Sequence, residues 1–176
     1  MNSKEIEFIF SNSNSADELF DAFHIAISEK IRDEELYKKL LWNKALSADE
    51  ISMFAEKISH DFPELSFNIF FWTAQVFESI SNYGEYHNHA FKYFKKSAAS
   101  DIKWHEPYLT VCRMYNHELN IPDFNHLVEF VKTGINNSEL KSVLCFAMAD
   151  LYYAKGEIKL MRTYSNMGEK FQKEGK

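Results

Sequence analysis

Residues 143–168 read VLCFAMADLYYAKGEIKLMRTYSNMG, and this stretch decides the fold of the chain. Its apolar residues recur every three or four positions up to Tyr152, which is the spacing of one buried face of an α-helix. A turn follows at Lys155-Gly156-Glu157, where glycine tolerates the backbone conformation of a sharp turn. Residues 158–171 then resume the helical spacing. The stretch therefore predicts two antiparallel helices joined by a short turn, which is a helical hairpin.

The same pattern continues toward the N-terminus. Gly134 and Gly168 are each expected to end the second helix of a hairpin, and they stand one repeat apart in the chain. Ala90, Leu127 and Met161 follow one another at similar intervals, at an equivalent position of the second helices. All of these intervals lie in the mid-thirties, and such a period with two helices per unit is typical of a helical solenoid. We therefore expect an all-α fold, an antiparallel helix-hairpin α-α superhelix of about three to four units.

Two segments resemble the tetratricopeptide repeat (TPR) family, namely Gly84-Glu85-Tyr86 with Ala90–Phe94 and Asp101, and Ala149–Tyr152 with Lys155–Glu157. Small Ala149 lets the two helices of a unit approach, and Tyr152 fills the groove between them. The resemblance covers residues 70–176 and includes degenerate repeats. The chain departs from the family in one additional residue between Tyr86 and Ala90, in Tyr115 where a small residue is favoured, and in Pro122 at a turn glycine.

The domain organisation follows from this repeat. Residues 1–15 end in the polar run SNSNS and are expected to form an N-terminal polar segment that is partly flexible. Residues 16–176 are predicted to form a single all-helical domain. Within it, residues 16–63 are either N-terminal acidic helices or a degenerate repeat, and residues 64–176 are the TPR-like repeats.

Capping residues predict where the first helices begin. Ser15 and Ser47 are each followed three residues later by glutamate, which is the pattern of a capping box. Another helix is expected to begin near Asp33. The pair Phe62-Pro63 is expected to end the third helix, because the residue before proline is disfavoured in the α conformation. A fourth, nearly apolar helix is expected over about residues 64–82.

The charge of the chain is unevenly distributed. The formal net charge is −6, from 20 basic and 26 acidic residues, and residues 1–63 alone hold 7 basic and 13 acidic side chains. No basic stripe is visible, so we expect no nucleic-acid partner. The acidic first third would instead attract a basic partner.

Cysteine usage and hydropathy indicate the compartment. Cys112 and Cys145 lie within apolar helical patterns, which favours free thiols and a reduced compartment. The first residues do not form an export signal, so a cytoplasmic location is expected. The most apolar stretch, residues 67–77, is shorter than the roughly 20 residues that cross a bilayer, so no membrane association is expected. One side of this stretch could also mediate association between copies of the chain.

Motifs for catalysis or metal binding do not occur. The seven histidines include no H-E-x-x-H pair, and the two cysteines form no C-x-x-C pair. Nucleotide-binding glycine motifs and the G-x-S-x-G nucleophile motif are also missing. We therefore expect no enzyme activity, no catalytic residue, no cofactor and no metal, with a histidine-dependent metalloenzyme as a minor alternative.

The resemblance to TPR proteins implies that ligands bind the concave surface lined by the first helix of each unit. Carried over to this sequence, the implied partner-binding residues are Glu78, Asn82, Asn116, Asp150 and Tyr153. This polar and acidic set with one aromatic residue favours a basic or amide-rich peptide. The carboxylate-clamp subgroup of the family uses lysine and arginine here, and this chain has no basic residue at those places, so a clamp function is disfavoured.

The sequence thus favours a non-enzymatic protein–protein interaction module, such as an adaptor, that binds a protein or peptide partner in a concave helical groove. The alternative is a small acidic immunity or inhibitor protein that neutralises a basic toxin or enzyme. Acidic surfaces accelerate the capture of basic partners, and the charge of residues 1–63 supports this alternative.

Overall fold

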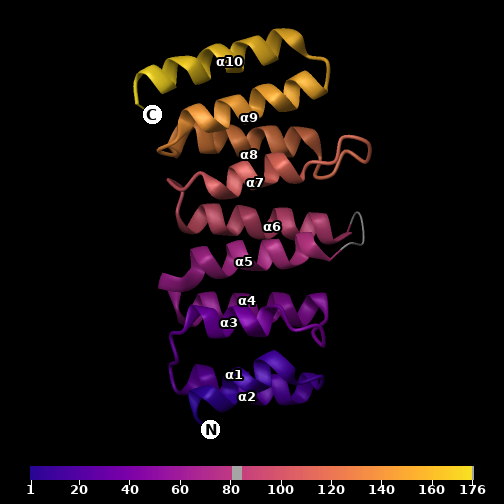
Figure 1. Ribbon diagram of the computed structural model, residues 1–176, viewed down its shortest axis with the longest axis vertical. Coiled ribbons are helices and arrows are strands. Elements are labelled where there is room, and N and C mark those ends of the chain that lie inside the picture. The colour runs from indigo at the N-terminus through magenta and orange to yellow at the C-terminus, as the bar shows by residue number, and fades with distance from the viewer. Residues whose placement is uncertain (81–84, 176) are drawn as a thin grey trace.

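The computed structural model describes residues 1–80 and 85–175 of the chain (Figure 1). These residues form ten α-helices and one short 3-10 helix, η1, and within them the only β pairing is a single isolated bridge. The elements are α1 (Ser3–Asn12), α2 (Ala16–Ser28), α3 (Glu34–Leu41), α4 (Ala48–Asp61), η1 (Pro63–Leu65), α5 (Ser66–Ser79), α6 (Glu85–Ser100), α7 (Glu106–Met114), α8 (Phe124–Asn137), α9 (Lys141–Ala154) and α10 (Ile158–Lys173). The prediction of an all-α fold is confirmed.

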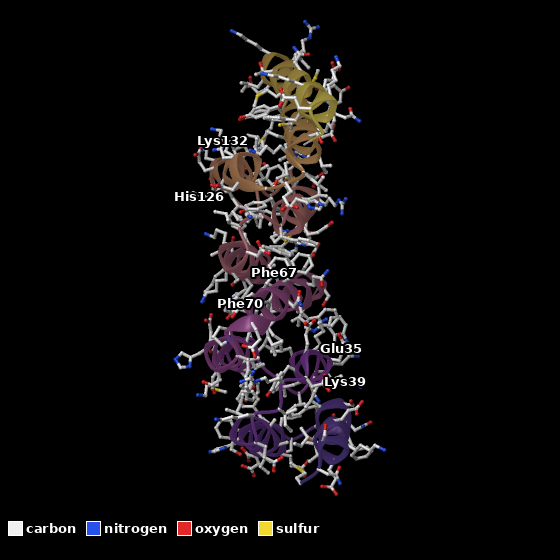
Figure 2. All side chains as sticks on the ribbon, turned by 90° about the vertical axis from the view of Figure 1, so that its left-hand side faces the viewer. Glu35, Lys39, Phe67, Phe70, His126 and Lys132 are labelled. Carbon is white, nitrogen blue, oxygen red and sulfur yellow. The ribbon has the colours of Figure 1, made fainter. Side chains whose placement is uncertain are left out.

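The helices lie across the long axis of the molecule and are stacked from α1 and α2 at one end to α10 at the other (Figure 1). Most consecutive helices contact each other, and contacts also join α1 to α3, α3 to α5 and α7 to α9. Figure 2 shows two layers, with Glu35 and Lys39 of α3 on one side and His126 and Lys132 of α8 on the other. We call the outer surface of α1, α3, α5, α7 and α9 the odd-helix face.

Polar contacts join α3 and α5 within this layer. The Asn68 side-chain amide donates a hydrogen bond to the Glu34 carboxylate, with 2.7 Å between Nδ2 and Oε2. The Trp72 indole N–H donates to the backbone carbonyl of Lys38 at 3.1 Å. Because both bonds cross from one hairpin to the next, they fix the register of the stack as well as the spacing of α3 and α5.

Capping residues begin α3 and α4 where the sequence predicts. The Ser47 hydroxyl accepts the N–H of Glu50, and the Glu50 carboxylate accepts the N–H of Ser47, which completes the expected capping box. The Asp33 carboxylate accepts the N–H of Leu36 at the start of α3. Both contacts satisfy backbone donors that a helix start leaves without a partner.

The predicted capping box at α2 forms only in part. The Ser15 hydroxyl accepts the N–H of Glu18, but the Glu18 carboxylate accepts a hydrogen bond from the Ser13 hydroxyl instead of from the Ser15 backbone. At the other boundary the prediction is confirmed, since α4 ends at Asp61, immediately before Phe62-Pro63.

The segment 1–15, which we expected to be polar and partly flexible, contains helix α1. A capping box at Asn2 begins this helix, and Ile6 and Phe10, one turn apart, are fully buried. Helix α1 contacts α2 and α3, so the all-helical domain begins with α1 and not at residue 16. The segment is ordered because the apolar stripe of α1 packs against these helices. The polar run at residues 11–15 comes after this stripe and does not interrupt it.

Gly134 and Gly168 do not end their helices, contrary to the sequence prediction. Helix α8 continues to Asn137 and α10 to Lys173. A Cβ atom at Gly134 would come within 2.6 Å of Tyr108 Cγ, and one at Gly168 within 2.8 Å of Phe146 Cε1. The repeated glycine therefore marks two places where a second helix closely approaches the first helix of its own hairpin. The predicted turn glycine Gly156 does adopt a positive φ, of 77°.

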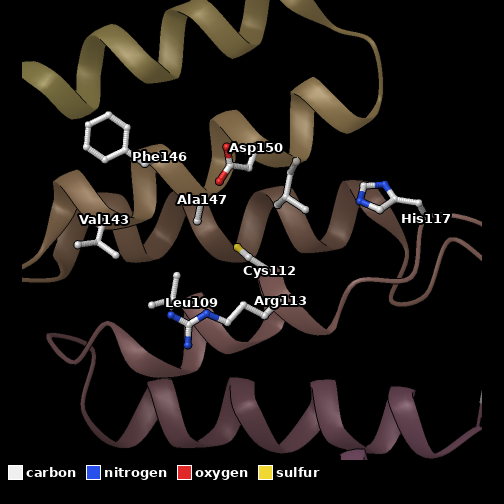
Figure 3. A pocket seen from close by; sticks show the side chains of 9 residues that line it. Leu109, Cys112, Arg113, His117, Val143, Phe146, Ala147 and Asp150 are labelled. Atoms are coloured by element: carbon white, nitrogen blue, oxygen red, sulfur yellow. The ribbon is translucent and has the colours of Figure 1, made fainter.

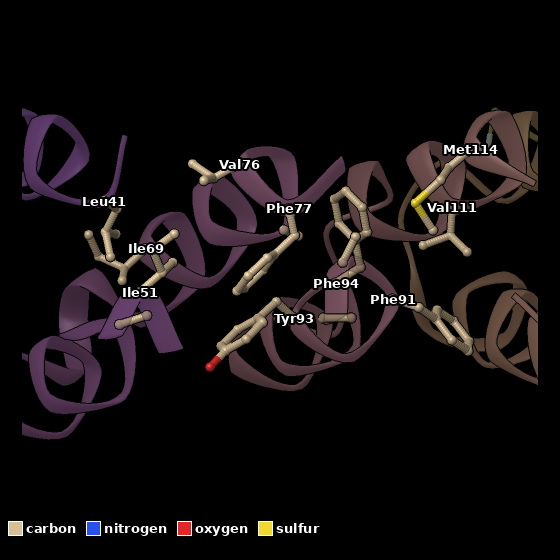
Figure 4. Close-up of a cluster of buried hydrophobic side chains, with 14 of the residues drawn as sticks. Leu41, Ile51, Ile69, Val76, Phe77, Phe91, Tyr93, Phe94, Val111 and Met114 are labelled. Atoms are coloured by element: carbon tan, nitrogen blue, oxygen red, sulfur yellow. The ribbon is translucent and has the colours of Figure 1, made fainter. Parts of the chain in front are cut away.

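A continuous apolar core runs along the stack. In Figure 4, Phe77 of α5 lies against Tyr93 of α6, and their ring centroids are 5.6 Å apart. Phe94 of α6 packs against Phe71 of α5, with 5.5 Å between ring centroids. The predicted apolar helix is confirmed as α5, although it begins at Ser66 after η1, and residues 81 and 82 lie outside the described part. The aromatic side chains of residues 67–77 are buried or half-buried between the neighbouring helices.

Candidate binding cleft between α7 and α9

A cleft of about 430 Å³ opens between α7 and α9, two neighbouring helices of the odd-helix face (Figure 3). It is lined by Leu109, Cys112, Arg113, His117, Val143, Phe146, Ala147, Asp150 and Leu151. Most of these residues come from one stripe of each helix, because positions three or four apart lie on the same helical face. The cleft is therefore built mainly from two helices, and His117 joins it from the turn after α7.

Opposite charges line the cleft without pairing. Arg113 lies on the α7 wall and Asp150 on the α9 wall, with Cys112 between them in Figure 3. Both charged side chains are exposed. Within residues 1–80 and 85–175, neither side chain forms an ion pair or a side-chain hydrogen bond, whereas seven ion pairs join a lysine or arginine to a carboxylate elsewhere. The cleft thus presents one unpaired cation and one unpaired anion beside an apolar surface.

The Cys112 thiol is held in its protonated form. Burial raises the pKa of Cys112 to about 12, the positive charge of Arg113 opposes this shift, and the negative charge of Asp150 adds to it. A thiol of this pKa is a poor nucleophile at neutral pH, because the thiolate is the reactive form. Cys145, which is fully buried in the core, likewise has its pKa raised to about 11 by burial.

The cleft does not provide a metal site. In the part of the chain that the structure describes, no three histidine, cysteine, aspartate or glutamate side chains converge so that they could hold a metal ion. The arrangement of Arg113, Asp150 and the apolar side chains can instead bind a ligand that offers both charges and an apolar group.

The structure brings Asp150 and Tyr153 of the predicted site together on α9. Asp150 lines the cleft, and Tyr153 follows it by about one turn with 65% of its surface exposed. An exposed tyrosine beside a cleft offers both an apolar ring and a hydroxyl to a ligand.

The remaining predicted residues lie elsewhere. The Asn116 side-chain oxygen accepts the N–H groups of Glu118 and Leu119, so it is engaged in the turn that follows α7. Glu78 is half-buried on α5, where burial raises the pKa of its carboxyl group. Asn82 lies outside the described residues.

The sequence analysis did not predict Arg113, His117 or the apolar side chains that line the cleft. One signal was available, since Cys112 and Cys145 lie on α7 and α9, the first helices of two successive hairpins. Arg113 directly follows Cys112 in the sequence. That it faces Asp150 depends on how α7 and α9 are placed relative to each other, and a single sequence does not contain this information.

No protein-family model, no curated protein and no solved structure matches this chain. Among the described residues, no helix combines the length and the apolar character needed to cross a membrane.

Proposed function

We propose that the protein is a TPR-like α-α superhelix that acts as a non-enzymatic interaction module and binds a peptide segment of a partner protein on the odd-helix face. The observation that carries this proposal is the unpaired arrangement of Arg113 and Asp150 on opposite walls of an apolar cleft. Two charges that do not neutralise each other remain available to a ligand, and a bound segment that satisfied both would gain charge-assisted hydrogen bonds.

The same face also offers aromatic side chains away from the cleft. Trp42 at the end of α3 is 50% exposed, and its ring centroid lies 5.9 Å from that of Trp72 on α5. Tyr153 is exposed next to the cleft. Aromatic residues are enriched at protein interfaces, because they bury a large area at a low cost in conformational entropy. An extended partner segment could thus contact several hairpins at once.

A peptide-display library tests this proposal. The wild-type protein is expected to enrich peptides that carry an acidic and a basic residue around an apolar one. The charge reversals Arg113→Glu and Asp150→Lys should each reduce binding of an enriched peptide about tenfold or more. Arg162→Glu on α10 and Glu169→Lys are matched controls, because both residues are exposed outside the cleft. Equal binding by the wild type and both cleft variants would refute the proposal.

The acidic immunity or inhibitor role stays a second proposal, favoured by the net charge of residues 1–63. In that role the association rate with a basic toxin or enzyme would fall steeply with salt concentration, because long-range attraction sets the rate. An association rate that does not depend on salt would exclude this role and leave the interaction module.

A further inference from the structure

A second surface groove lies between α2 and α4, in the even-numbered layer. It has a volume of about 400 Å³ and is lined by Phe20, Phe23, His24, Ile27 and Ser28 of α2 and by Met53 and Lys57 of α4. Carbon atoms form almost all of its surface. The groove shares no residue with the α7–α9 cleft.

Two large apolar side chains that line this groove are exposed to solvent, although the aromatic side chains next to them are buried. Phe20 is 48% exposed and Met53 is 44% exposed. Beneath them Phe23 and Phe54 are buried and pack against each other, with their ring centroids 4.5 Å apart. The Phe20 ring lies 6.4 Å from that of Phe54, so it is positioned by the same aromatic cluster. The groove is thus preformed, and an apolar ligand could enter it without rearranging the core.

The rim of the groove is acidic. Asp17 precedes Phe20 by three residues and Asp21 precedes His24 by three residues, so each lies about one helical turn from a residue that lines the groove. Asp49 precedes Met53 by one turn of α4. All three carboxylates are exposed and form no ion pair or side-chain hydrogen bond with the described residues. The net charge of the rim is therefore negative.

Lys57, the one lysine among the residues that line the groove, is paired with a carboxylate. The Lys57 ammonium lies 2.9 Å from an oxygen of Asp61, one turn later on α4. Because Asp61 neutralises Lys57 locally, the lysine does not offset the charges of Asp17, Asp21 and Asp49. The surface consequently combines an apolar floor with unpaired negative charge.

We infer that this groove docks an amphipathic helix of a partner protein whose apolar stripe is flanked by lysine and arginine. Apolar side chains spaced three, four and seven residues apart would contact Phe20 and Met53, as in other helix-in-groove complexes. Basic residues beside that stripe would meet the carboxylates of Asp17, Asp21 and Asp49, and an acidic helix would be repelled. This inference stands apart from the proposed function, since the two surfaces lie on different layers.

A synthetic helix tests the inference directly. The probe is a peptide of about 18 residues, long enough for roughly five helical turns, with leucine along one face and lysine on the rest. One control peptide keeps the leucines and replaces lysine with glutamate, and another has the leucine–lysine sequence scrambled. Binding to the full chain is measured by fluorescence anisotropy, and the Met53 methyl signal is followed by nuclear magnetic resonance.

The leucine–lysine helix is expected to bind, to shift the Met53 methyl signal and to lose affinity as salt is added. Phe20→Gln should weaken binding about tenfold, and the triple variant Asp17→Asn, Asp21→Asn, Asp49→Asn should weaken it similarly and flatten its salt dependence. Phe8→Gln is the matched control, because Phe8 is 68% exposed on α1 outside the groove. It should leave affinity unchanged. Circular dichroism of each variant verifies that the helices remain folded.

Several outcomes would overturn the inference. They are no binding by the leucine–lysine helix, equal binding of the glutamate or scrambled peptide, or an unchanged affinity of Phe20→Gln. Self-association of the free protein that Phe20→Gln abolishes would assign the groove to a second copy of the chain instead. Because Arg113→Glu and Asp150→Lys leave this groove intact, they should not alter peptide binding here, so failure of one proposal is distinguishable from failure of the other.

Discussion

Gly134 of α8 lies directly against the ring of Tyr108 of α7. A Cβ atom at Gly134 would come within 2.6 Å of Tyr108 Cγ and within 2.9 Å of Leu144 Cδ1 of α9. Tyr108 is itself buried, so its ring cannot move into solvent to make room. One glycine thus sets how closely three helices approach.

Gly134→Ala is therefore expected to destabilise the protein, although alanine favours helices over glycine by about 1 kcal/mol. Overpacking against the Tyr108 ring should cost about 1–3 kcal/mol and outweigh that gain. Urea unfolding followed by circular dichroism measures the difference. Asn136→Ala is the control, because Asn136 is exposed on the same helix and its replacement should be neutral or slightly stabilising. A higher urea midpoint for Gly134→Ala would show that α7 and α8 are further apart than described.

The packing of α1 is tested by two phenylalanines two residues apart. Phe10 is fully buried, whereas Phe8 is 68% exposed. Phe10→Ala should lower the free energy of unfolding by about 3–5 kcal/mol, because it leaves a cavity in the core. Phe8→Ala should change that free energy by less than about 0.5 kcal/mol. Equal effects of the two substitutions in thermal unfolding would mean that α1 does not pack on α2 and α3.

The capping box of α4 should be visible in the pH dependence of stability. Hydrogen bonds from the Ser47 hydroxyl and the Ser47 N–H lower the pKa of Glu50 from its ordinary value of 4.5. The pKa in the folded state is thus below that in the unfolded state. The stabilisation is present above pH 4.5 and is lost as the pH falls through the lowered folded-state pKa.

Glu50→Gln should accordingly lower the melting temperature at pH 7 and have little effect at about pH 2, where the carboxylate is protonated in both states. Ser47→Ala should cost about 1 kcal/mol at neutral pH, since it removes the helix cap. Asp49→Asn is the control, because it removes a charge from the same turn and leaves the capping box intact. An equal effect of Glu50→Gln at both pH values would contradict the assignment.

The two free thiols should resist modification in the folded protein. Burial raises the pKa of Cys112 to about 12 and that of Cys145 to about 11, so both are protonated at pH 8. Alkylation by iodoacetamide should therefore be at least about tenfold slower in the folded protein than in denaturant. Mass spectrometry of peptides containing each cysteine measures both rates. Rapid native modification of Cys112 would show that its sulfur is more accessible in the cleft than described.

The helix boundaries that were predicted correctly depend on short-range chemistry. The Ser47–Glu50 box, the Asp33 cap and the Phe62-Pro63 boundary each involve residues within three positions of one another, so a single sequence contains all the information needed. Helix α1 has the same kind of local signal, a capping box between Asn2 and Glu5, and the polar run SNSNS follows the helix without belonging to it.

The predictions that failed or were missed depend on tertiary contacts. Gly134 and Gly168 both lie in the second helix of a hairpin, and each is close to an aromatic ring on the first helix instead of ending its own helix. In the cleft, Asp150 was predicted from the resemblance to TPR proteins. Arg113 was not predicted, because its position opposite Asp150 follows from how α7 lies beside α9. Local sequence patterns predict where helices form. Which side chains line the same cleft depends on how the helices pack.

The first and last helices lie at opposite tips of an elongated stack, so the two ends of the described chain are far apart (Figure 1). Each helix contacts mainly its nearest neighbours, so the apolar core joins adjacent hairpins and no direct contact ties one end of the stack to the other. Small rotations between successive hairpins would add up along the stack and change its overall curvature. Fluorophores attached at the two tips would therefore report, by energy transfer, any curvature that a ligand imposes on the rod.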